Sequence, residues 1–392
     1  KVFELIKKEE KRQEETLMMI ASENYPFPEI SNAECLMLNN KYSEGYPGKR
    51  YYQGNKYIDE IENIAIENAK KLFGVEFANV QPYSGSPANA AAIMALLNPG
   101  EKIMGLKLSG GGHLTHGHPN ITFSGKFFQS VQYDVNADGW IDYDEIERLA
   151  IQEKPKLMVI GTTAYPRTLD FERYYKIAKS IGAYVLADIS HIAGLVAGGA
   201  HPSPVGFADV ITTTTHKTLR GPRGAMIMTN NPELAKKIDR AVFPGLQGGP
   251  HNATTAGIAI ALAHDYHDYA HQVVKNAKVL SEELIKLGFK LTTGGTDNHL
   301  MVINVGPTAK QIAFNLEEAG IVVNYNTIPH DPNPPSSPSG IRIGTPALTT
   351  QGMKEAEMKL IAGWIHDVIS NVECLIINEK VKELCKKFPI ND

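Results

Sequence analysis

The chain has few cysteines, no excess of positive charge and no long apolar run. Its three cysteines, Cys35, Cys374 and Cys385, show no metal-ligand spacing, which disfavours a disulfide-stapled secreted protein. No apolar run reaches the roughly 18 residues of a membrane helix, and no signal peptide opens the sequence. A net charge of -4 gives no basic surface of the kind that binds nucleic acid. We therefore expect a cytoplasmic protein without a metal site, a membrane span or a nucleic-acid partner.

The 392 residues are 43% hydrophobic, which is enough to bury a large core in two domains. Strand-like and helical patterns alternate from about residue 75 to residue 230, which predicts an α/β fold with a mostly parallel sheet. We expect a helical N-terminal arm over residues 1–73, a large domain over 74–265 and a smaller C-terminal domain over 266–392.

The smaller domain has its own sequence pattern. A long helical stretch over residues 257–289 leads into it, a strand is expected at 301–305, and a pair of helices closes it between 354 and 387. These patterns predict a mixed α+β domain.

Lys217 is the first candidate for covalent chemistry. It follows a β-branched run at residues 208–212 and precedes a turn at 220–224, so it is expected at the end of a strand, beside His216. Burial near other cations lowers the pKa of a lysine, and the neutral amine can attack an aldehyde such as pyridoxal phosphate. The alternative is a surface lysine in a basic turn.

Asp188 ends a second apolar strand candidate, over residues 182–191. An aspartate kept ionised at the end of a buried strand can hold the pyridine nitrogen of pyridoxal phosphate protonated, which makes the ring an electron sink. The same residue could instead cap the following turn.

The phosphate of such a cofactor needs several donors at one place. In the segment 81–97, Ser84, Gly85 and Ser86 precede a helical pattern, with Ser86 expected as the N-cap and Pro87 as the first helical residue. A helix N-terminus directs backbone N–H groups at an anion. A glycine-rich loop at 244–251 could add donors.

Arg342 is the candidate for binding a substrate carboxylate. It lies in a short apolar strand that a turn closes at residues 340–346, and its planar guanidinium suits a carboxylate. An arginine on an exposed edge strand is the ordinary alternative.

Residues 134–145 match a calcium-binding EF-hand loop at every ligand position, so a calcium-binding protein is the alternative outside enzymes. An EF-hand needs a helix on both sides, however, and the preceding residues 125–133 have the pattern of a strand. We expect a strand, an acidic turn and then a helix from about Asp142, with Asp144 and Glu145 in its first turn.

The chain resembles the serine hydroxymethyltransferase family over nearly its whole length. The resemblance rests on five segments in order, which are Ile20-Ala21-Ser22-Glu23-Asn24, Lys41 to Tyr52 (KYSEGYPGKRYY), Gly111 to Gly117 (GGHLTHG), Thr215-His216-Lys217 and Gly294 to Leu300 (GGTDNHL). It implies a pyridoxal phosphate-dependent transferase of fold type I, with a mostly parallel seven-stranded sheet, a smaller C-terminal α+β domain, and a homodimer whose active sites lie between subunits.

The resemblance also implies the residues that hold the cofactor. Lys217 would bind it covalently, Asp188 would contact the ring nitrogen and His113 would stack on the ring. His191 would approach the ring hydroxyl, and Thr214 and His216 would flank the lysine. The phosphate would be bound by a larger set, namely Ser84, Gly85 and Ser86, with Tyr42 and Gly249 from a partner subunit.

The substrates would be serine or glycine and tetrahydrofolate, with the hydroxymethyl carbon of serine passing to the folate. By the resemblance, Ser22, Tyr52 and Arg342 would hold the amino acid, and Glu44 would transfer protons. The implied folate contacts are Tyr51, Leu108, Gly112, Leu114, Phe243 and Asn326. A threonine aldolase of the same fold, which needs no folate, is the alternative among enzymes.

Three positions depart from the family pattern. Gly110 stands where many bacterial relatives have histidine, Thr163 where serine is usual, and Pro87 where glutamine is common. The first two could alter the contacts to folate or to the ring hydroxyl, whereas Pro87 suits the first turn of a helix.

Overall fold

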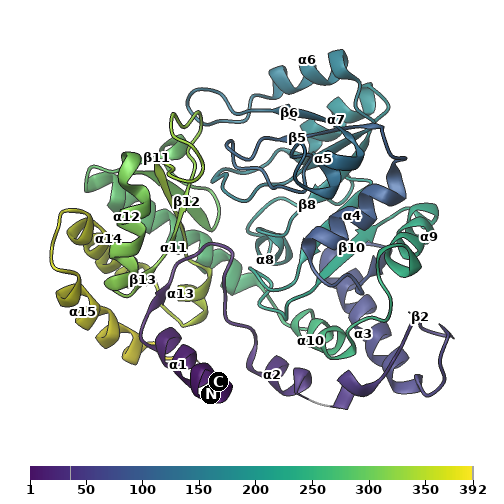
Figure 1. Cartoon of the computed structure of the whole chain (residues 1–392), viewed down its shortest axis with the longest axis horizontal. Coiled ribbons are helices and arrows are strands. Elements are labelled where there is room, and N and C mark those ends of the chain that lie inside the picture. The colour runs from purple at the N-terminus through teal and green to yellow at the C-terminus, as the bar shows by residue number, and fades with distance from the viewer. Residues whose placement is uncertain (36, 391–392) are drawn as a thin grey trace.

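The computed structural model describes residues 1–35 and 37–390, in which two sheets form separate cores (Figure 1). A seven-stranded sheet with its helices occupies one side of the molecule, and a four-stranded sheet with the C-terminal helices occupies the other. The chain begins at α1, and Ile390, near its other end, lines a cavity with Glu10, Gln13 and Glu14 of that helix.

The large sheet is mostly parallel, as predicted. Its strand order is β4-β10-β9-β8-β7-β5-β6, and β10 runs in the direction opposite to the other six strands. The strands are β4 (Phe77–Asn79), β10 (Ala225–Thr229), β9 (Val210–Thr214), β8 (Tyr184–Asp188), β7 (Leu157–Ile160), β5 (Lys102–Leu106) and β6 (Gln129–Tyr133). Helices cover both faces of a parallel sheet, which explains why β7, β9 and β10 are buried at every position.

The helices of this layer follow the predicted alternation. They are α4 (Gly85–Leu96), α5 (Phe123–Phe127), α6 (Tyr143–Glu153), α7 (Phe171–Ser180), α8 (Ala193–Ala197), α9 (Pro232–Arg240) and α10 (Asn252–Ala261), with an irregular turn at Ala241–Leu246 between the last two. The expectation of a strand over 125–133 is wrong at its start. Residues 123–127 form α5, and the chain becomes extended only at Phe128.

The smaller sheet is antiparallel, in the order β11-β12-β15-β14. Its strands are β11 (Lys290–Leu291), β12 (Leu300–Asn304), β15 (Gly340–Gly344) and β14 (Asn324–Asn326), and its helices are α11 (His267–Lys286), α12 (Ala309–Glu318), α13 (Pro346–Thr350), α14 (Glu355–Ile369) and α15 (Cys374–Lys387), with 3-10 turns at Thr292–Gly294 and Gly306–Thr308. The stretch 257–289 is two helices rather than one, because α10 ends at Ala261 and Tyr266 is the N-cap of α11.

The N-terminal residues join both halves of the molecule. They form α1 (Val2–Glu14), β1 (Leu17–Met18), α2 (Pro28–Glu34), a 3-10 turn at Met37–Asn40, the hairpin β2 (Gly45–Tyr46) and β3 (Lys49–Arg50), and α3 (Lys56–Phe73). Strand β1 pairs with β13 (Ile321–Val322), so Leu17 lies in the core of the small sheet. Helix α3 instead packs on α10 in the large part.

The EF-hand-like loop is a strand, a turn and a helix, as its context predicts. Strand β6 precedes it and α6 follows it, with Asp142 as the N-cap. Asp134 pairs with Lys107 at 3.2 Å, and Glu145 pairs with Arg148 at 2.6 Å. The helix-loop-helix geometry of an EF-hand is therefore not formed. Separately, no helix among the described residues is long and apolar enough to cross a membrane.

Candidate active site

A cavity of about 210 Å³ lies beside the carboxyl ends of β8 and β9, next to the N-terminus of α4. In parallel α/β sheets this edge is the usual place for a ligand. The cavity is lined by Ser84, Gly85, Ser86, Asn89, His113, His116, Thr162, Thr163, Asp188, Ser190, His191, Thr214, His216, Lys217 and Arg223. Nine of the predicted site residues therefore meet here: the phosphate triplet, His113, Asp188, His191, Thr214, His216 and Lys217.

Lys217 comes three residues after the end of β9, and its side chain lines the cavity. Its pKa is lowered from 10.5 to about 8, chiefly by burial; the charge of Asp188 acts in the opposite direction, and those of Arg342 and Arg223 add to the lowering. The neutral amine is therefore a minor form near neutral pH, but a far larger one than for an ordinary lysine, and it is the nucleophilic form.

Asp188 ends β8 and accepts four hydrogen bonds. Its Oδ2 accepts from Asn89 Nδ2 at 2.8 Å and from His116 Nε2 at 2.9 Å, and its Oδ1 accepts from the backbone and the hydroxyl of Ser190. Burial alone would raise its pKa, but the hydrogen bond and charge of His116 outweigh burial and hold the pKa well below its ordinary value. The carboxylate is thus ionised, as a partner for a pyridinium must be.

His113 lies beside the same carboxylate in an uncharged form. Its Nδ1 is 2.7 Å from the hydroxyl of Thr115, and burial and the neighbouring His116 lower its pKa to about 4. A neutral imidazole can stack on an aromatic cation without charge repulsion.

The phosphate loop differs in detail from the prediction. Helix α4 begins at Gly85 with Ser84 as the N-cap, so Ser86 is already helical and Pro87 is the third helical residue instead of the first. Pro87 still fits, because the first N–H groups of a helix have no partner within it. A Cβ atom on Gly85 would lie 2.7 Å from Thr214 Cγ2, so this close approach requires glycine.

Arg342 lies in the middle of β15, behind the wall of the cavity. Its Nη1 donates to the carbonyl of Thr163 at 2.7 Å, and its Nε donates to Asn324 Oδ1 at 3.0 Å. Burial lowers its pKa to about 10, so it remains a cation at neutral pH. The predicted strand position is confirmed. Thr163, which stands where serine is usual in the family, thus forms part of the wall between this arginine and the cavity.

Six predicted site residues lie elsewhere, on and around the β2–β3 hairpin. Tyr42 packs edge-on against Tyr52 with ring centroids 5.4 Å apart, and Tyr51 packs against Phe243 at 5.7 Å. Gly249 faces the ring of Tyr42, and Glu44 faces the neighbouring Gly248. We call these six the hairpin cluster: Tyr42, Glu44, Tyr51, Tyr52, Phe243 and Gly249. None of them lines the Lys217 cavity.

Arg50 fixes the hairpin to the body of the protein. Its buried guanidinium pairs with Glu62 of α3 at 2.6 Å and with Asp59 at 2.8 Å. It also donates to the carbonyls of Ser43 and Gly45, which flank Glu44. A buried charge bound on all sides holds this backbone in one geometry.

The remaining predicted residues lie outside the lining of the Lys217 cavity. Ser22 lines an adjoining cavity of about 320 Å³ that shares His216 and Arg223 with the first one. Gly112 accepts a hydrogen bond from the hydroxyl of Thr163 at 2.8 Å. Leu108 and Leu114 flank Gly112 in the loop after β5, and Asn326 ends β14.

Gly110 lies in the same loop. A Cβ atom there would lie 3.0 Å from Asp134 Oδ1 and 3.1 Å from Leu106 Cδ1. A side chain at this position would require the side chains of Asp134 or Leu106 to shift slightly, so the local packing is closely fitted to glycine.

Sequence reasoning assigned no role to Asn89, His116, Ser190 or Arg223, although all four line the cavity. Three of them orient Asp188 by hydrogen bonds. His116 carried a signal, since it stands three residues after His113 in a glycine-rich loop. The others were recognisable only once the strands were placed next to one another.

The cavity fits pyridoxal phosphate by its polar groups. Among the described residues, His116 Nδ1 and His216 Nδ1 are buried without a hydrogen-bond partner. Buried polar atoms are normally paired, so these two unpaired nitrogens indicate room in the cavity for a polar ligand or water. An ionised carboxylate, a lysine with a lowered pKa and a helix N-terminus meet the needs of the ring nitrogen, the aldehyde and the phosphate.

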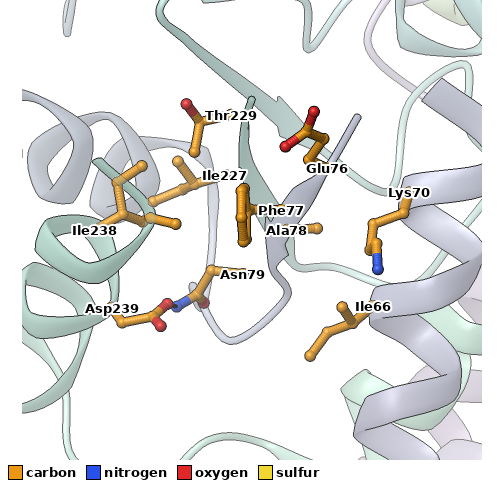
Figure 2. Close-up of a pocket in the computed structure, with 11 residues that line it drawn as sticks. Ile66, Lys70, Glu76, Phe77, Ala78, Asn79, Ile227, Thr229, Ile238 and Asp239 are labelled. Carbon is orange, nitrogen blue, oxygen red and sulfur yellow. Dashed lines mark hydrogen bonds between the residues drawn. The ribbon is translucent and has the colours of Figure 1, made fainter. Parts of the chain in front are cut away.

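A second cavity, of about 180 Å³, lies at the edge strand β4, between α3 and α9 (Figure 2). The ring of Phe77 stands in its centre, with Ile238 and Asp239 on one side and Ile66 and Lys70 on the other. It shares no residue with the Lys217 cavity. We therefore do not include it in the candidate site.

The fold and this site define a pyridoxal phosphate-dependent enzyme of fold type I. The family model for serine hydroxymethyltransferase matches residues 1–365. A serine hydroxymethyltransferase of Acidothermus cellulolyticus is 54% identical and one of Desulfotalea psychrophila is 52% identical, each over 99% of this chain and over 95% and 93% of their own lengths. Serine hydroxymethyltransferase 2 of Pseudomonas fluorescens is 50% identical over 99% of this chain and 96% of its own.

The chain therefore belongs to the serine hydroxymethyltransferase family. The prediction of a pyridoxal phosphate-dependent transferase that interconverts serine and glycine with tetrahydrofolate is confirmed. The matches favour this family over a threonine aldolase and over a calcium-binding protein.

Proposed function

We propose that this chain performs the reaction of its family with Lys217 as the covalent cofactor residue, Asp188 at the ring nitrogen, His113 on the ring face, and Ser84, Gly85 and Ser86 at the phosphate. The observation that carries this proposal is that these groups line one cavity at the ends of β8 and β9. Pyridoxal phosphate, when bound, supplies an electron sink for the bonds at the substrate Cα.

The chain's own groups would then select and orient the amino acid. Arg342 would bind the substrate carboxylate, and Ser22 and Tyr52 would complete that binding. Arg342 uses Nε and one N–H of Nη1 for Asn324 and Thr163, and its guanidinium has further N–H groups that can bind the carboxylate. His191 and His216 would contact the cofactor, and burial keeps the pKa of each below its ordinary value.

Glu44 would hold and release a proton at the hydroxymethyl group of serine, because general acid–base catalysis needs a carboxyl group close to the reacting oxygen. The folate would lie against a larger set on the hairpin and the cavity rim, which comprises Tyr51, Leu108, Gly112, Leu114, Phe243 and Asn326. The edge-to-face rings of Tyr51 and Phe243 support an aromatic ligand beside them.

We further propose a homodimer in which the hairpin cluster serves the partner's cavity. Within one chain, Tyr42 and Tyr51 remain 60% and 70% exposed and contribute nothing to the Lys217 cavity. Large exposed aromatic side chains of this kind are typical of interfaces. With the partner in place, Tyr42, Gly249 and Glu44 would complete each site. A cytoplasmic location stays a prediction.

Mixing two inactive variants tests the proposal. Lys217→Gln removes the covalent residue and Glu44→Gln removes the proton carrier, so each homodimer should have very little activity with serine and tetrahydrofolate. If one site takes Lys217 from one subunit and Glu44 from the other, refolded mixtures should regain about a quarter of wild-type activity, because half of the dimers are hybrids with one intact site.

Two outcomes would contradict the proposal. No regained activity in mixtures proven to contain hybrids would place Lys217 and Glu44 in the same subunit. Folate-independent cleavage of β-hydroxy amino acids by a wild-type protein that does not respond to tetrahydrofolate would point to the aldolase.

A further inference from the structure

Residues 17–27 connect the Arg342 strand to the Lys217 turn, and we call them the connecting segment. At its start, Leu17 and Met18 pair with β13 of the small part. The backbone N–H of Gly344, the last residue of β15, donates to the Met19 carbonyl at 2.8 Å. The segment is therefore attached to the strand that carries Arg342.

The other end of the segment holds the turn from Lys217 to Arg220. The Phe27 N–H donates to the Arg220 carbonyl at 3.1 Å, and Arg220 Nε donates to the Tyr25 carbonyl at 3.2 Å. The Arg220 guanidinium also lies 4.2 Å from the ring centroid of Phe27. Arg220 has a left-handed backbone with a φ of 52°, which is uncommon for a residue with a side chain. The contacts with the segment offset the cost of that backbone.

Asn24 makes the direct contact with Lys217. Its Nδ2 donates to the Lys217 carbonyl at 3.0 Å and to the Tyr269 hydroxyl of α11 at 2.7 Å. Its Oδ1 accepts from the Thr350 hydroxyl of α13 at 2.7 Å and from the backbone N–H of Tyr25 at 2.9 Å.

The orientation of this amide follows from its partners. A backbone carbonyl can only accept a hydrogen bond, so the nitrogen of Asn24 must face Lys217. Both hydrogens and both lone pairs are then used. Substituting alanine for Asn24 would remove the two side-chain donors and the acceptor, whereas substituting aspartate would remove both donors and keep the acceptor.

We propose that Asn24 is a positioning residue that fixes the backbone of Lys217 relative to the Arg342 strand, so that the lysine and the carboxylate-binding arginine keep a constant separation. This inference rests on the roles proposed above for Lys217 and Arg342. Asn24 is suited to the task because one side chain joins the lysine turn, α11 and α13, and α13 begins two residues after β15 ends.

Loosening this junction should change the titration of Lys217. The groups that act on its amine or lie against it are Asp188, Arg223, Arg342, His113, His191, His216 and His299. Burial is the main cause of its lowered pKa of about 8. A turn freed from Asn24 would admit water, and the pKa would rise toward its ordinary value.

The test uses Asn24→Ala in the full chain, freed of cofactor. Pyridoxal phosphate is added at a series of pH values, and the rate at which its lysine-bound absorbance develops gives the pKa of Lys217. We expect a midpoint near 8 in the wild type and a midpoint higher by roughly half a unit or more in the variant. After loading, kcat/KM for serine should fall roughly ten- to a hundredfold, since small misplacements of reacting groups cost this much.

Asn68→Ala is the matched control. Asn68 also bridges two elements, because its Nδ2 donates to the Ala259 carbonyl at 2.9 Å, but it does not contact Lys217. This variant should lower Tm without moving the midpoint. Thr350→Val removes one partner of Asn24 and leaves the bond to Lys217, so it should shift the midpoint in the same direction by less. If Asn24→Ala does not fold, the titration midpoints of Thr350→Val and Tyr269→Phe are measured in its place.

The inference would be overturned if Asn24→Ala had the same titration midpoint and kinetics as the wild type and only a lower Tm, as in Asn68→Ala. Asn24 would then have a structural role alone. If Asn24→Ala does not fold, an unmoved midpoint in both Thr350→Val and Tyr269→Phe would overturn it equally. A wild-type protein that develops no lysine-bound absorbance would instead overturn the proposed function itself.

Discussion

The Lys217 cavity and the hairpin cluster are two parts of one proposed site, yet they are built in opposite ways. Around Lys217 the groups are buried, and Asp188 accepts four hydrogen bonds within one chain. In the hairpin cluster the backbone is fixed by the buried Arg50, while Tyr42 and Tyr51 are left exposed. The difference teaches that the ionised carboxylate and the lysine proposed for the cofactor are arranged within one chain, whereas the hairpin cluster, by our proposal, would act in the partner's cavity.

The largest effect is expected at Asp188, in the buried half of the site. Asp188→Asn keeps the shape but places an NH₂ group where four donors converge, so kcat with serine and tetrahydrofolate should fall roughly a thousandfold, as loss of a buried charge partner costs about 4 kcal/mol. Asp170→Asn is the matched control, because Asp170 only caps α7. Comparable kcat values in the two variants would mean that Asp188 is not the partner of the cofactor.

Glu44→Gln should separate catalysis from stability. Loss of the proton carrier should lower kcat roughly a hundredfold, which lies within the range for general acid–base groups. Tm and the absorbance of the bound cofactor should stay at wild-type values, because the hydrogen bonds from Arg50 that fix the hairpin go to backbone carbonyls and other side chains. A lowered Tm would show that Glu44 is part of the hairpin's support.

Gly85→Ala tests the close packing at the phosphate end. The added Cβ would lie 2.7 Å from Thr214 Cγ2, so the N-terminus of α4 must shift. We expect roughly tenfold weaker binding of pyridoxal phosphate and a loss of about 1–3 kcal/mol in the free energy of unfolding. Gly363→Ala, in α14 with no atom within 4 Å of the added Cβ, should change neither quantity for the worse. Unchanged cofactor affinity in Gly85→Ala would remove the phosphate role of this turn.

The smallest predicted effect is on stability, and it is measured on Lys217→Met and the wild type, both free of cofactor. The pKa of Lys217 is about 8 in the folded chain against 10.5 in the unfolded chain, so the unfolded state binds more protons between these values. Wild-type stability should therefore rise with pH from 8 to 10.5, by about 1–3 kcal/mol. Urea unfolding of both proteins should show Lys217→Met more stable at pH 7, with the gap closing as pH approaches 10.5. A gap independent of pH would contradict the lowered pKa.

Much of the buried half of the site was predictable from local patterns. Asp188 and Lys217 follow short apolar runs, and the carboxyl ends of parallel strands meet at one edge of a sheet. The helix start was misjudged by two residues, because Pro87 is tolerated anywhere in the first turn and does not mark its first position. Residues 125–127 were predicted as strand, although they end α5, because a five-residue helix shows too little periodicity to separate it from a strand.

The hairpin residues were reached through the family resemblance alone. No local pattern around Glu44 or Tyr51 distinguishes a catalytic hairpin from a surface loop. Its anchor, Arg50 with Glu62, joins residues twelve positions apart through a buried ion pair that spacing does not reveal.

By itself the sequence determined the class of fold, the strand ends that carry Asp188 and Lys217, and the family. These depend on periodicity and on motifs that are local in the chain. Only the tertiary structure decided that His116, Asn89 and Ser190 share the Asp188 carboxylate, and that Asn24 binds a lysine 193 positions away. Such contacts depend on how distant elements pack, because a hydrogen bond requires atoms within about 3 Å, and only packing brings distant residues so close.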